Sequence, residues 1–431
     1  MPYYYIWTIG CQMNKAESQR ISGYLDSIGW RNTESYRDAD RVVLNTCVVR
    51  QSAENKVLGT LGLLKGLKNE RPGLSILLTG CFVEPRIGEL QKQFPQVDLF
   101  FKPGDYLTFG NWLQAQGFCS TFDALHPPTA DNNGSPCVQL PIIQGCNNFC
   151  SYCIVPYRRG REKSRPMEEI VSEVHSLVEA GVKEVTLLGQ NVNSYGNDLL
   201  ERPDLADLLT ELNGIDGLSR IRFLTNHPKD MTVKLMKTIN SLDKVCEHIN
   251  LAAQSGDDMI LKAMRRGYTV EYFRQLVDSI RQHIVNISLS TDIIVGFPGE
   301  SDEQFEHTCS LIEDIGFDVV HLAVYSPRPG TIASRKYMDD VPIELKKERF
   351  TKLEKLQENI ADSKNSFYQG KNVEVLVEGR KKGKWYGRSR NDKLTFFNDN
   401  HDCMGKLITV KVNKTSPWAL QGEVRYNNKL N

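Results

Sequence analysis

The chain has 431 residues, of which 40% are hydrophobic and 25% charged, a composition typical of a globular protein with more than one domain. No uninterrupted apolar run approaches the roughly 20 residues of a membrane-spanning helix, and Met1 is not followed by a basic region and an apolar stretch, so we expect a cytoplasmic protein without a membrane partner. The net charge is +0, but residues 364–425 contain 13 Lys or Arg against 6 Asp or Glu, an excess suited to contacts with phosphates.

Cysteine is the residue type that most constrains the function. The chain has 11 cysteines, and a reducing cytoplasm disfavours structural disulfides. Metal ligation is therefore the first question to ask of each cysteine.

Residues 1–118 are predicted to form a doubly wound α/β domain with a parallel sheet. Strand-like segments at 3–9, 41–44 and 74–78 alternate with helical patterns at 14–28 and 53–68. A cysteine directly follows each strand: Cys11, Cys47 and Cys81. Because ligands bind at the carboxyl edge of such a sheet, the three could converge on one ligand. From the residues alone, three unrelated buried cysteines are an equally good interpretation.

Residues 119–136 are polar and contain several Pro, Asn and Gly, which is typical of a linker. Strands and helices then alternate again through residues 137–363. The expected strands are 138–143, 183–188, 220–224, 248–251, 288–295 and 319–324. This pattern predicts a full or partial β/α barrel whose active site lies at the carboxyl ends of the strands.

A charged helix is predicted at 343–369, at the end of the barrel. Five short strands are then expected at 373–378, 385–389, 394–397, 407–412 and 419–424. They predict a small all-β barrel within residues 364–427.

The sharpest chemical signal is a group of three cysteines, Cys146, Cys150 and Cys153, in the loop after the first barrel strand. Three thiolates within eight residues suit an iron–sulfur cluster, and three ligands leave a fourth iron open to a small molecule. The alternatives are a structural zinc site or a redox pair. Zinc needs a fourth ligand, however, and no nearby histidine supplies one.

These three cysteines resemble the cluster motif of the radical S-adenosylmethionine superfamily. The resemblance implies a [4Fe–4S] cluster whose open iron chelates S-adenosylmethionine, and it implies reductive cleavage of that cofactor to a 5′-deoxyadenosyl radical. Tyr152 matches a position that packs near the adenine, although a plain core aromatic residue is an equal interpretation. Further cofactor contacts are expected at strand ends, where glycine permits close approach: Gly189, Gln190, Asn191, Gln254, Gly296 and Pro298.

The first three cysteines resemble a second pattern. Gly10-Cys11-Gln12-Met13-Asn14, Asn45-Thr46-Cys47-Val48-Val49-Arg50 and Gly80-Cys81 are similar to the N-terminal signatures of the methylthiotransferase family. The resemblance covers nearly the whole chain and implies that Cys11, Cys47 and Cys81 bind a second [4Fe–4S] cluster. The other five cysteines match no ligand position and are expected to pack in the protein: Cys119, Cys137, Cys246, Cys309 and Cys403.

The terminal barrel resembles the TRAM domain, an RNA-binding module. Its basic segment interleaves cations with aromatic residues, which suits backbone contacts and base stacking, with a solvated loop as the alternative. The expected RNA contacts are Arg380, Lys381, Lys382, Lys384, Arg388 and Arg390. After the cysteine motif, Arg158, Arg159 and Arg161 either face substrate phosphates or pair with neighbouring carboxylates.

Within the family, the motifs around Cys11 and Cys47 resemble the tRNA 2-methylthio-N6-isopentenyladenosine synthase branch. This implies transfer of a methylthio group to C2 of the modified adenosine next to the anticodon, with two S-adenosylmethionine molecules, one as methyl donor and one as radical source. The expected partners are tRNA and an external electron donor such as a flavodoxin or ferredoxin. The alternatives are the same chemistry on threonylcarbamoyladenosine, or a non-catalytic iron–sulfur protein that binds RNA or carries electrons.

Two segments depart from the pattern of this branch. Asn250-Leu251-Ala252-Ala253-Gln254-Ser255-Gly256 replaces His-Leu-Pro-Val-Gln-Ser-Gly, and Phe82-Val83-Glu84-Pro85 replaces Met-Ala-Gln-Arg. All six predicted cluster ligands are retained. The departures therefore concern local contacts to the substrate or the cofactor.

Overall fold

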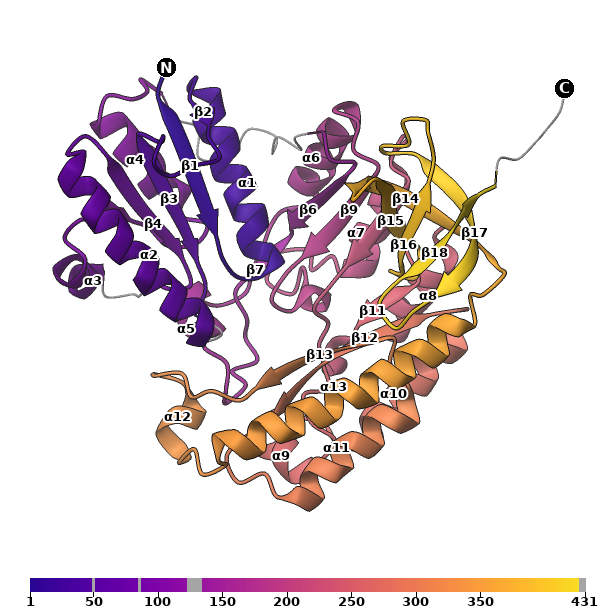
Figure 1. Ribbon diagram of the computed structural model, residues 1–431. Coiled ribbons are helices and arrows are strands. Elements are labelled where there is room, and N and C mark those ends of the chain that lie inside the picture. Colours follow the sequence, from indigo (N-terminus) through magenta and orange to yellow (C-terminus); the bar gives the residue numbers. More distant parts are fainter. Residues whose placement is uncertain (49–50, 84–86, 122–133, 426–431) are drawn as a thin grey trace, which may run out of the picture.

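The computed structural model describes residues 1–48, 51–83, 87–121 and 134–425. It consists of an N-terminal α/β domain, a central parallel half-barrel and a small closed β-barrel near the C-terminus (Figure 1). The predicted fold class is therefore confirmed. None of the helices in the described ranges is long and apolar enough to cross a membrane.

The N-terminal domain is built on five parallel strands in the order β2-β1-β3-β4-β5. The strands are β1 (Tyr3–Thr8), β2 (Arg31–Asn32), β3 (Arg41–Thr46), β4 (Ser75–Gly80) and β5 (Leu99–Phe100). After β1, the chain first adds β2 at one edge of β1 and then adds β3 at the opposite edge. This reversal creates a topological switch point, and ligands bind beyond the carboxyl ends of the strands at such a point.

Helices cover both faces of this sheet. The side chains of β3 alternate, so that Val43 packs with α1 (Gln12–Ser27) and α4 (Tyr106–Ala115), whereas Val42 and Leu44 face α2 (Gln51–Glu70) and α3 (Ile87–Gln93). A strand places successive side chains on opposite faces, which explains why a continuous apolar run forms a strand with two buried faces. The doubly wound prediction is correct.

The central part contains six parallel strands: β6 (Cys137–Pro141), β9 (Glu184–Leu188), β10 (Arg220–Phe223), β11 (His248–Asn250), β12 (Ser288–Val295) and β13 (Val319–Val324). They form the sheets β6-β9-β10 and β11-β12-β13, which are joined by isolated parallel bridges such as Asn226↔Leu251. In the described ranges β6 and β13 are not paired, so the barrel is partial rather than full.

The outside of the half-barrel is covered by helices. The longer ones are α6 (Met167–Glu179), α7 (Leu205–Asn213), α8 (Val233–Ser241), α10 (Val270–His283), α11 (Asp302–Ile315) and α13 (Ile343–Ser366). Short helices lie at strand ends: α5 (Val155–Arg159), η1 (Val192–Ser194), η2 (Pro228–Asp230), α9 (Asp258–Ala263) and α12 (Ile332–Lys336). One large apolar core joins the longer helices to the strands.

The predicted strand 138–143 is divided in the structure. β6 ends at Pro141, and β7 (Ile143–Gln144) pairs antiparallel with β8 (Lys163–Ser164). The division follows the hydrogen bonds, because the Ile142 amide makes the last bond to β9 and the chain then turns away from the sheet. The short ribbon closes the base of loop 145–162, which carries three cysteines.

The small barrel consists of β14 (Asn372–Lys381), β15 (Lys384–Ser389), β16 (Leu394–Asn398), β17 (Leu407–Thr415) and β18 (Leu420–Val424), closed in the order β14-β15-β16-β18-β17. It covers the amino ends of the half-barrel strands. Arg220 at the start of β10 donates to the Arg388 carbonyl at 2.7 Å, and Lys393 pairs with Asp318 at 2.7 Å just before β13. The carboxyl ends of the strands remain on the side of the cysteine loop.

Candidate active site

The structure brings the three N-terminal cysteines together at the carboxyl edge of their sheet. Cys11 follows β1, Cys47 follows β3 and Cys81 follows β4. A side chain added at Gly10 would lie 2.7 Å from the Cys47 Cβ atom, so these two segments are in contact. Burial raises the pKa of Cys81, and Cys11 lies close enough to contribute to that rise.

Gly80 allows the end of β4 to approach β3 closely enough to form this edge. Its φ is +93°, and an added Cβ would lie 2.2 Å from the Thr46 carbonyl oxygen. The next amide, that of Cys81, donates to this same oxygen at 2.8 Å. Only glycine fits here, because a side chain would push Cys81 away from the other two cysteines.

The second group of cysteines lies in loop 145–162. The Cys146 amide donates to the Gly160 carbonyl at 3.2 Å, and the Cys153 amide donates to the Cys150 carbonyl at 3.0 Å. Ser151 fixes the loop to α9, since its amide bonds the Met264 carbonyl at 2.9 Å. Burial raises the pKa of Cys146 to about 11 and that of Cys153 to about 12.

The donor chemistry of both groups fits iron–sulfur clusters. Each offers three thiols, and a buried arginine donates to one sulfur atom of each group, as hydrogen bonds to cluster sulfurs do in such proteins. Within the described part of the chain, no three His, Cys, Asp or Glu side chains form a group fitted to one metal ion. The remaining five cysteines lie buried or half-buried away from these groups: Cys119, Cys137, Cys246, Cys309 and Cys403.

Arg266 is a site residue that the sequence reasoning missed. Its Nη1 atom donates to the Cys150 sulfur at 3.4 Å, and Nη2 donates to the Ala252 carbonyl at 2.6 Å. The Tyr268 hydroxyl accepts from Nε at 3.0 Å and itself donates to the Ala253 carbonyl at 2.7 Å. No local sequence signal marks Arg266, because its role depends on the docking of the α9 region against the cysteine loop.

Of the two interpretations given for Arg159, the structure supports pairing with a carboxylate. Its side chain is 2% exposed and pairs with Glu17 at 2.6 Å, so the carboxylate interpretation holds for this arginine. Arg159 also donates to the Cys81 sulfur at 3.3 Å, a contact that the sequence did not indicate. Arg158 is half-buried, and Arg161 is exposed with its guanidinium 4.3 Å from the centre of the Phe149 ring.

The residues predicted to contact the cofactor at the end of β9 lie beside the cysteine loop. Gln190 accepts a hydrogen bond from the Gly145 amide at 2.5 Å and so fixes the start of that loop. Asn191 is buried and donates to Asp230 at 2.7 Å, whereas its Oδ1 atom has no hydrogen-bond partner among the described residues. Gly189 packs directly against Ile143.

Asn226, after β10, was not predicted and has a similar environment. Its Nδ2 atom donates to the Asn250 carbonyl at 3.0 Å, and its buried Oδ1 atom lacks a partner within the described ranges. A buried acceptor without a partner is costly. Asn191 and Asn226 therefore fit a polar ligand at the mouth of the half-barrel.

The other predicted cofactor residues have mixed environments. Gln254 adopts φ +74°, which is rare for a side chain of this type. The Gly296 amide is bonded to Glu300 at 2.7 Å, and Pro298 is buried two residues later. Tyr152 is half-buried and packs with the cluster around Phe297, as the core interpretation expected. Their contacts with a cofactor stay predictions.

The basic residues of the small barrel divide into two sets. Arg390 pairs with Glu247 at 2.7 Å and donates to two carbonyls of the half-barrel, so its guanidinium joins the two parts. Arg388 pairs with Asp392 at 3.2 Å, and Lys384 donates to Gln421 at 3.2 Å.

The other set lies on the β14–β15 hairpin. Lys382 and Gly383 both have positive φ, +49° and +81°, which is the geometry of a two-residue type I′ turn. Arg380, Lys381 and Lys382 are exposed, and the Arg380 guanidinium lies 5.5 Å from the centre of the Trp385 ring. The Trp385 ring itself packs in the core of the small barrel, so base stacking at this hairpin stays a prediction.

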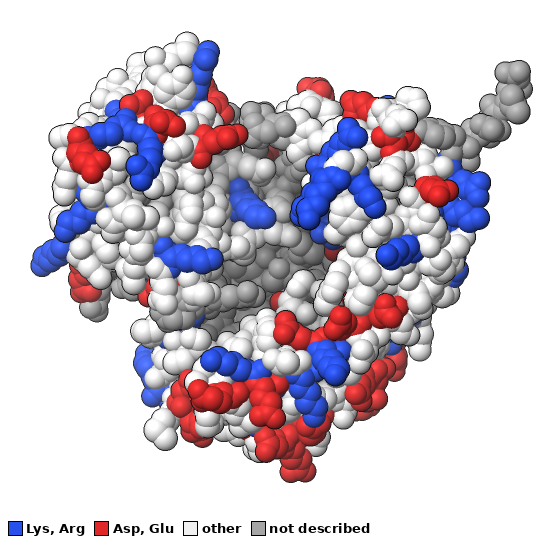
Figure 2. Space-filling view, in the orientation of Figure 1, with Lys and Arg blue, Asp and Glu red and all other residues white. Residues whose placement is uncertain are grey.

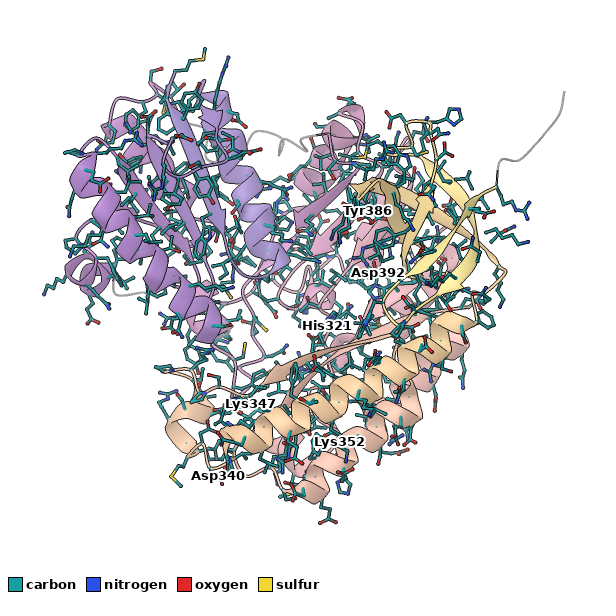
Figure 3. All side chains as sticks on the ribbon, viewed as in Figure 1. His321, Asp340, Lys347, Lys352, Tyr386 and Asp392 are labelled. Carbon is teal, nitrogen blue, oxygen red and sulfur yellow. The ribbon has the colours of Figure 1, made fainter. Side chains whose placement is uncertain are left out.

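A hollow opens between the N-terminal domain and the other two parts, and Lys and Arg side chains lie along its rim (Figure 2). Figure 3 places Tyr386 of β15 and His321 of β13 at the junction of the small barrel and the half-barrel. The Tyr386 ring packs 6.0 Å from Phe396. The surface beside the hollow therefore combines positive charge with aromatic rings.

Comparison with known protein families assigns each part of the chain. Residues 140–312 match the radical SAM superfamily, residues 3–102 match uncharacterized protein family UPF0004, and residues 366–424 match the TRAM domain. A curated relative named tRNA-2-methylthio-N(6)-dimethylallyladenosine synthase, from Dehalococcoides mccartyi strain CBDB1, is 50% identical over 98% of this chain and 99% of its own length. The chain belongs to the tRNA-2-methylthio-N(6)-dimethylallyladenosine synthase family.

Other members of the synthase family show the same extent of similarity. Relatives with that name from Herpetosiphon aurantiacus and Chloroflexus aurantiacus are 47% and 46% identical, over 98% and 99% of this chain and 97% and 92% of their own lengths. As a member of the radical SAM superfamily, this protein uses S-adenosylmethionine and a [4Fe–4S] cluster. Dimethylallyladenosine is the nucleoside called isopentenyladenosine above, so the predicted branch is confirmed.

Solved structures support the fold. The radical S-adenosylmethionine methyltransferase TsrM from Kitasatospora setae matches with a TM-score of 0.56 and 14% identity, over 78% of this chain and 75% of its own. The cobalamin-dependent radical enzyme OxsB matches with a TM-score of 0.55 and 12% identity, over 96% of this chain and 65% of its own. At these identities the likeness concerns the arrangement of elements alone.

Proposed function

We propose that this chain is a tRNA methylthiotransferase that adds a methylthio group to C2 of N6-dimethylallyladenosine, using two molecules of S-adenosylmethionine. The observation that carries the proposal is the presence of two three-cysteine groups at neighbouring strand ends of two domains, linked by the contact of Arg159 with Cys81. One group suits radical formation and the other suits a sulfur-bearing centre. The relative from Dehalococcoides mccartyi matches 98% of this chain.

The [4Fe–4S] cluster of the radical SAM domain is assigned to Cys146, Cys150 and Cys153. A cluster held there together with S-adenosylmethionine would supply reductive cleavage of the cofactor and, through it, hydrogen abstraction from an unactivated carbon. The chain's own residues hold this loop in place. Gln190 and Ser151 fix it from both sides, and Arg266 supplies positive charge beside the Cys150 sulfur.

Cys11, Cys47 and Cys81 are assigned to a second [4Fe–4S] cluster. Its support is the switch-point geometry and the donor set, because three thiols from three adjacent strand ends suit a cluster with one open iron. Arg328, in the loop after β13, pairs with Glu54 at 3.3 Å and lies near Cys47. Buried cations near both groups offset the negative charge that thiolates bring.

Asn191, Asn226 and Gln254 are proposed to bind the polar parts of S-adenosylmethionine. The unpartnered oxygens of the two asparagines suit N–H or O–H donors of the cofactor. The His227 imidazole beside them is neutral, because burial and the nearby Arg266 charge lower its pKa to about 2. It therefore orients ligands without adding charge.

The RNA substrate would be held by the exposed β14–β15 hairpin and the basic rim of the hollow. The target adenine must leave its stacked position to reach the carboxyl ends of the half-barrel strands, as enzymes that act on bases require. Arg161 is exposed near the cysteine loop and is available to a phosphate. We place the reaction in the cytoplasm, with a flavodoxin or ferredoxin as the electron donor.

The test compares two tRNA substrates. Protein reconstituted anaerobically with iron and sulfide is incubated with reductant, S-adenosylmethionine and tRNA that carries either dimethylallyladenosine or threonylcarbamoyladenosine, and the digested nucleosides are analysed by mass. The proposal predicts a methylthio group on the first nucleoside alone. Modification of the second would transfer the chain to the other substrate branch. Fully loaded protein that releases no 5′-deoxyadenosine would refute the radical chemistry.

A further inference from the structure

Arg159 physically connects the two cysteine groups. It ends α5, six residues after Cys153, and its side chain crosses into the N-terminal domain. Figure 1 shows α5 beside the end of that domain. Ile154 and Tyr157, which flank the crossing, pack in the apolar core around β3 and β4. The radical SAM loop is therefore docked on the N-terminal domain by apolar contacts as well as by this charge.

Every nitrogen of the Arg159 guanidinium is committed to the N-terminal domain. Nε donates to the Cys81 sulfur at 3.3 Å, Nη1 donates to Glu17 at 2.6 Å, and Nη2 donates to Asn14 at 2.9 Å and to Glu17 at 3.2 Å. Asn14 also accepts from the Cys11 thiol at 3.4 Å. Arg159 thus contacts one cysteine of the group directly and a second through Asn14.

The contacts of this guanidinium with Glu17 and with Cys81 have different consequences. Glu17 balances its charge, because a buried cation without a partner would be strongly destabilising. The N–H bond to the Cys81 sulfur is directional, and hydrogen bonds to ligand sulfurs are among the features that set the reduction potential of a cluster. A lysine could keep the charge, but it could not form this fork to three partners.

We propose that Arg159 is a positioning residue that holds the second cluster through Cys81 and raises the reduction potential of that cluster. The inference rests on the proposed function, specifically on a cluster at Cys11, Cys47 and Cys81. Reduction adds negative charge to the cluster, and a cationic N–H donor on its sulfur ligand stabilises the reduced state. Because Arg159 belongs to the loop of Cys153, the same contact fixes the second cluster relative to the radical site.

A matched control is available at the opposite end of the half-barrel. Arg222 forms an equally buried ion pair with Glu184 at 2.9 Å, and each side chain is 5% exposed. Arg222→Met therefore removes a buried arginine with a similar structural penalty, away from both cysteine groups. Arg159→Lys is the conservative variant, which keeps positive charge near Glu17.

The experiment isolates the second cluster in the full-length chain by replacing Cys146, Cys150 and Cys153 with alanine. Arg159→Met, Arg159→Lys and Arg222→Met are added separately, and each protein is reconstituted and titrated with reductant while the electron paramagnetic resonance signal is followed. Arg159→Met is expected to lower the reduction potential of the second cluster by at least about 59 mV, which for one electron is a tenfold change in the reduction equilibrium. Arg159→Lys should restore part of this shift, and Arg222→Met should cause none.

An unchanged potential in Arg159→Met would overturn the inference while leaving the second cluster intact. If Arg159→Met fails to hold a cluster, the potential of Arg159→Lys decides. A value below the parent supports the inference, and a value equal to the parent overturns it. If the parent with three alanines and intact Arg159 binds no cluster, the second-cluster assignment fails and the inference fails with it.

Discussion

Three of the predicted ligand cysteines directly follow a glycine with positive φ at the end of a strand. These glycines are Gly10, Gly80 and Gly145. In each case the glycine lets the chain leave its strand and turn the following cysteine toward the site. At Gly145 an added Cβ would lie 2.0 Å from the Arg161 carbonyl oxygen, so the space is as restricted as at Gly80. These glycines thus help to determine where the sulfur atoms of Cys11, Cys81 and Cys146 lie.

Replacing Gly80 by alanine should therefore disrupt one cluster site selectively. The Thr46 carbonyl leaves no space for the new methyl group, and the positive φ adds strain. We expect reconstituted Gly80→Ala to bind roughly four fewer iron atoms per chain, to retain S-adenosylmethionine cleavage and to lose methylthio transfer. Iron analysis and product analysis measure these effects. Gly73→Ala, with no atom within 4 Å of the new Cβ, is the control and should behave as the parent.

His248 gives the protein a defined dependence on pH. It is buried at the start of β11, beside Ser290, and burial lowers the pKa of its imidazole from 6.5 to about 4. Between these values the unfolded chain binds a proton that the folded chain does not, so stability falls as pH decreases below 6.5.

This histidine should lower the free energy of unfolding by up to about 1.4 kcal/mol per pH unit within that window, or by roughly 1.6 kcal/mol between pH 6.5 and pH 5. Urea unfolding of the metal-free chain at several pH values measures the slope. In the His248→Gln variant, the slope of unfolding free energy against pH should be smaller by the contribution of one proton. Parallel curves for the variant and the parent would contradict the assignment.

At the residue scale, the cysteines could be predicted from sequence and the arginines could not. Thiol ligands occur at short, fixed spacings or directly after strands, whereas Arg158, Arg159 and Arg161 look alike in sequence. Burial separates them, because α5 docks on the N-terminal domain and takes only Arg159 inside. The structure also explains why Ala252 and Ala253 can depart from the usual pattern. Arg266 and Tyr268 bind the backbone carbonyls of these residues, so the contacts do not depend on the side chains there.

At the scale of elements, strands were predicted well because their apolar runs are bounded by turn residues. β12 and β13 coincide with the predicted ranges 288–295 and 319–324. The short strands β2, β5, β7 and β8 were missed, because two-residue strands carry no period and depend on partners distant in sequence. Four residues of the predicted motifs lie outside the described residues: Val49, Arg50, Glu84 and Pro85.

The β14–β15 hairpin is the element expected to dominate RNA binding. Replacing Arg380, Lys381 and Lys382 by alanine should weaken tRNA binding and reduce the salt dependence of affinity by up to about two to three in the log–log slope. Filter binding at several salt concentrations measures both quantities. Cleavage of S-adenosylmethionine without tRNA should be unchanged.

The control for the hairpin is Lys347→Ala, on the exposed surface of α13 (Figure 3). This variant removes one positive charge from an element distant from the hairpin and should bind tRNA as the parent does. A loss of affinity per removed charge as large as that of the hairpin variant would mean that tRNA responds only to overall charge.

At the scale of the whole molecule, the three parts are joined by buried or half-buried arginines. Arg159 links the N-terminal domain to the half-barrel, and Arg220, Arg222 and Arg390 link the half-barrel to the small barrel. The secondary structure of each part could be predicted, because alternating strands and helices differ in sequence pattern from a series of short strands. Their relative placement could not, because it depends on contacts between residues distant in sequence, such as Arg159 with Glu17 and Ile154 with the N-terminal core.

Arg390→Ala should loosen the small barrel relative to the half-barrel. The variant loses the Glu247 pair and the bonds to the Asp243 and Val245 carbonyls. We expect KM for tRNA to rise several-fold with little change in kcat, because the chemistry occurs at the other end of the strands. Steady-state kinetics with limited proteolysis measures the effect. A fall in kcat at unchanged KM would show that this junction acts on the catalytic site.

The central claim is that a radical formed at the Cys146, Cys150 and Cys153 site takes the hydrogen from C2 of the adenine before the methylthio group is attached. The most direct measurement uses dimethylallyladenosine tRNA with deuterium at C2 and follows the masses of 5′-deoxyadenosine and of the modified nucleoside together. The account predicts one deuterium in 5′-deoxyadenosine for each methylthio group formed. Methylthio product accompanied by 5′-deoxyadenosine without deuterium would contradict it.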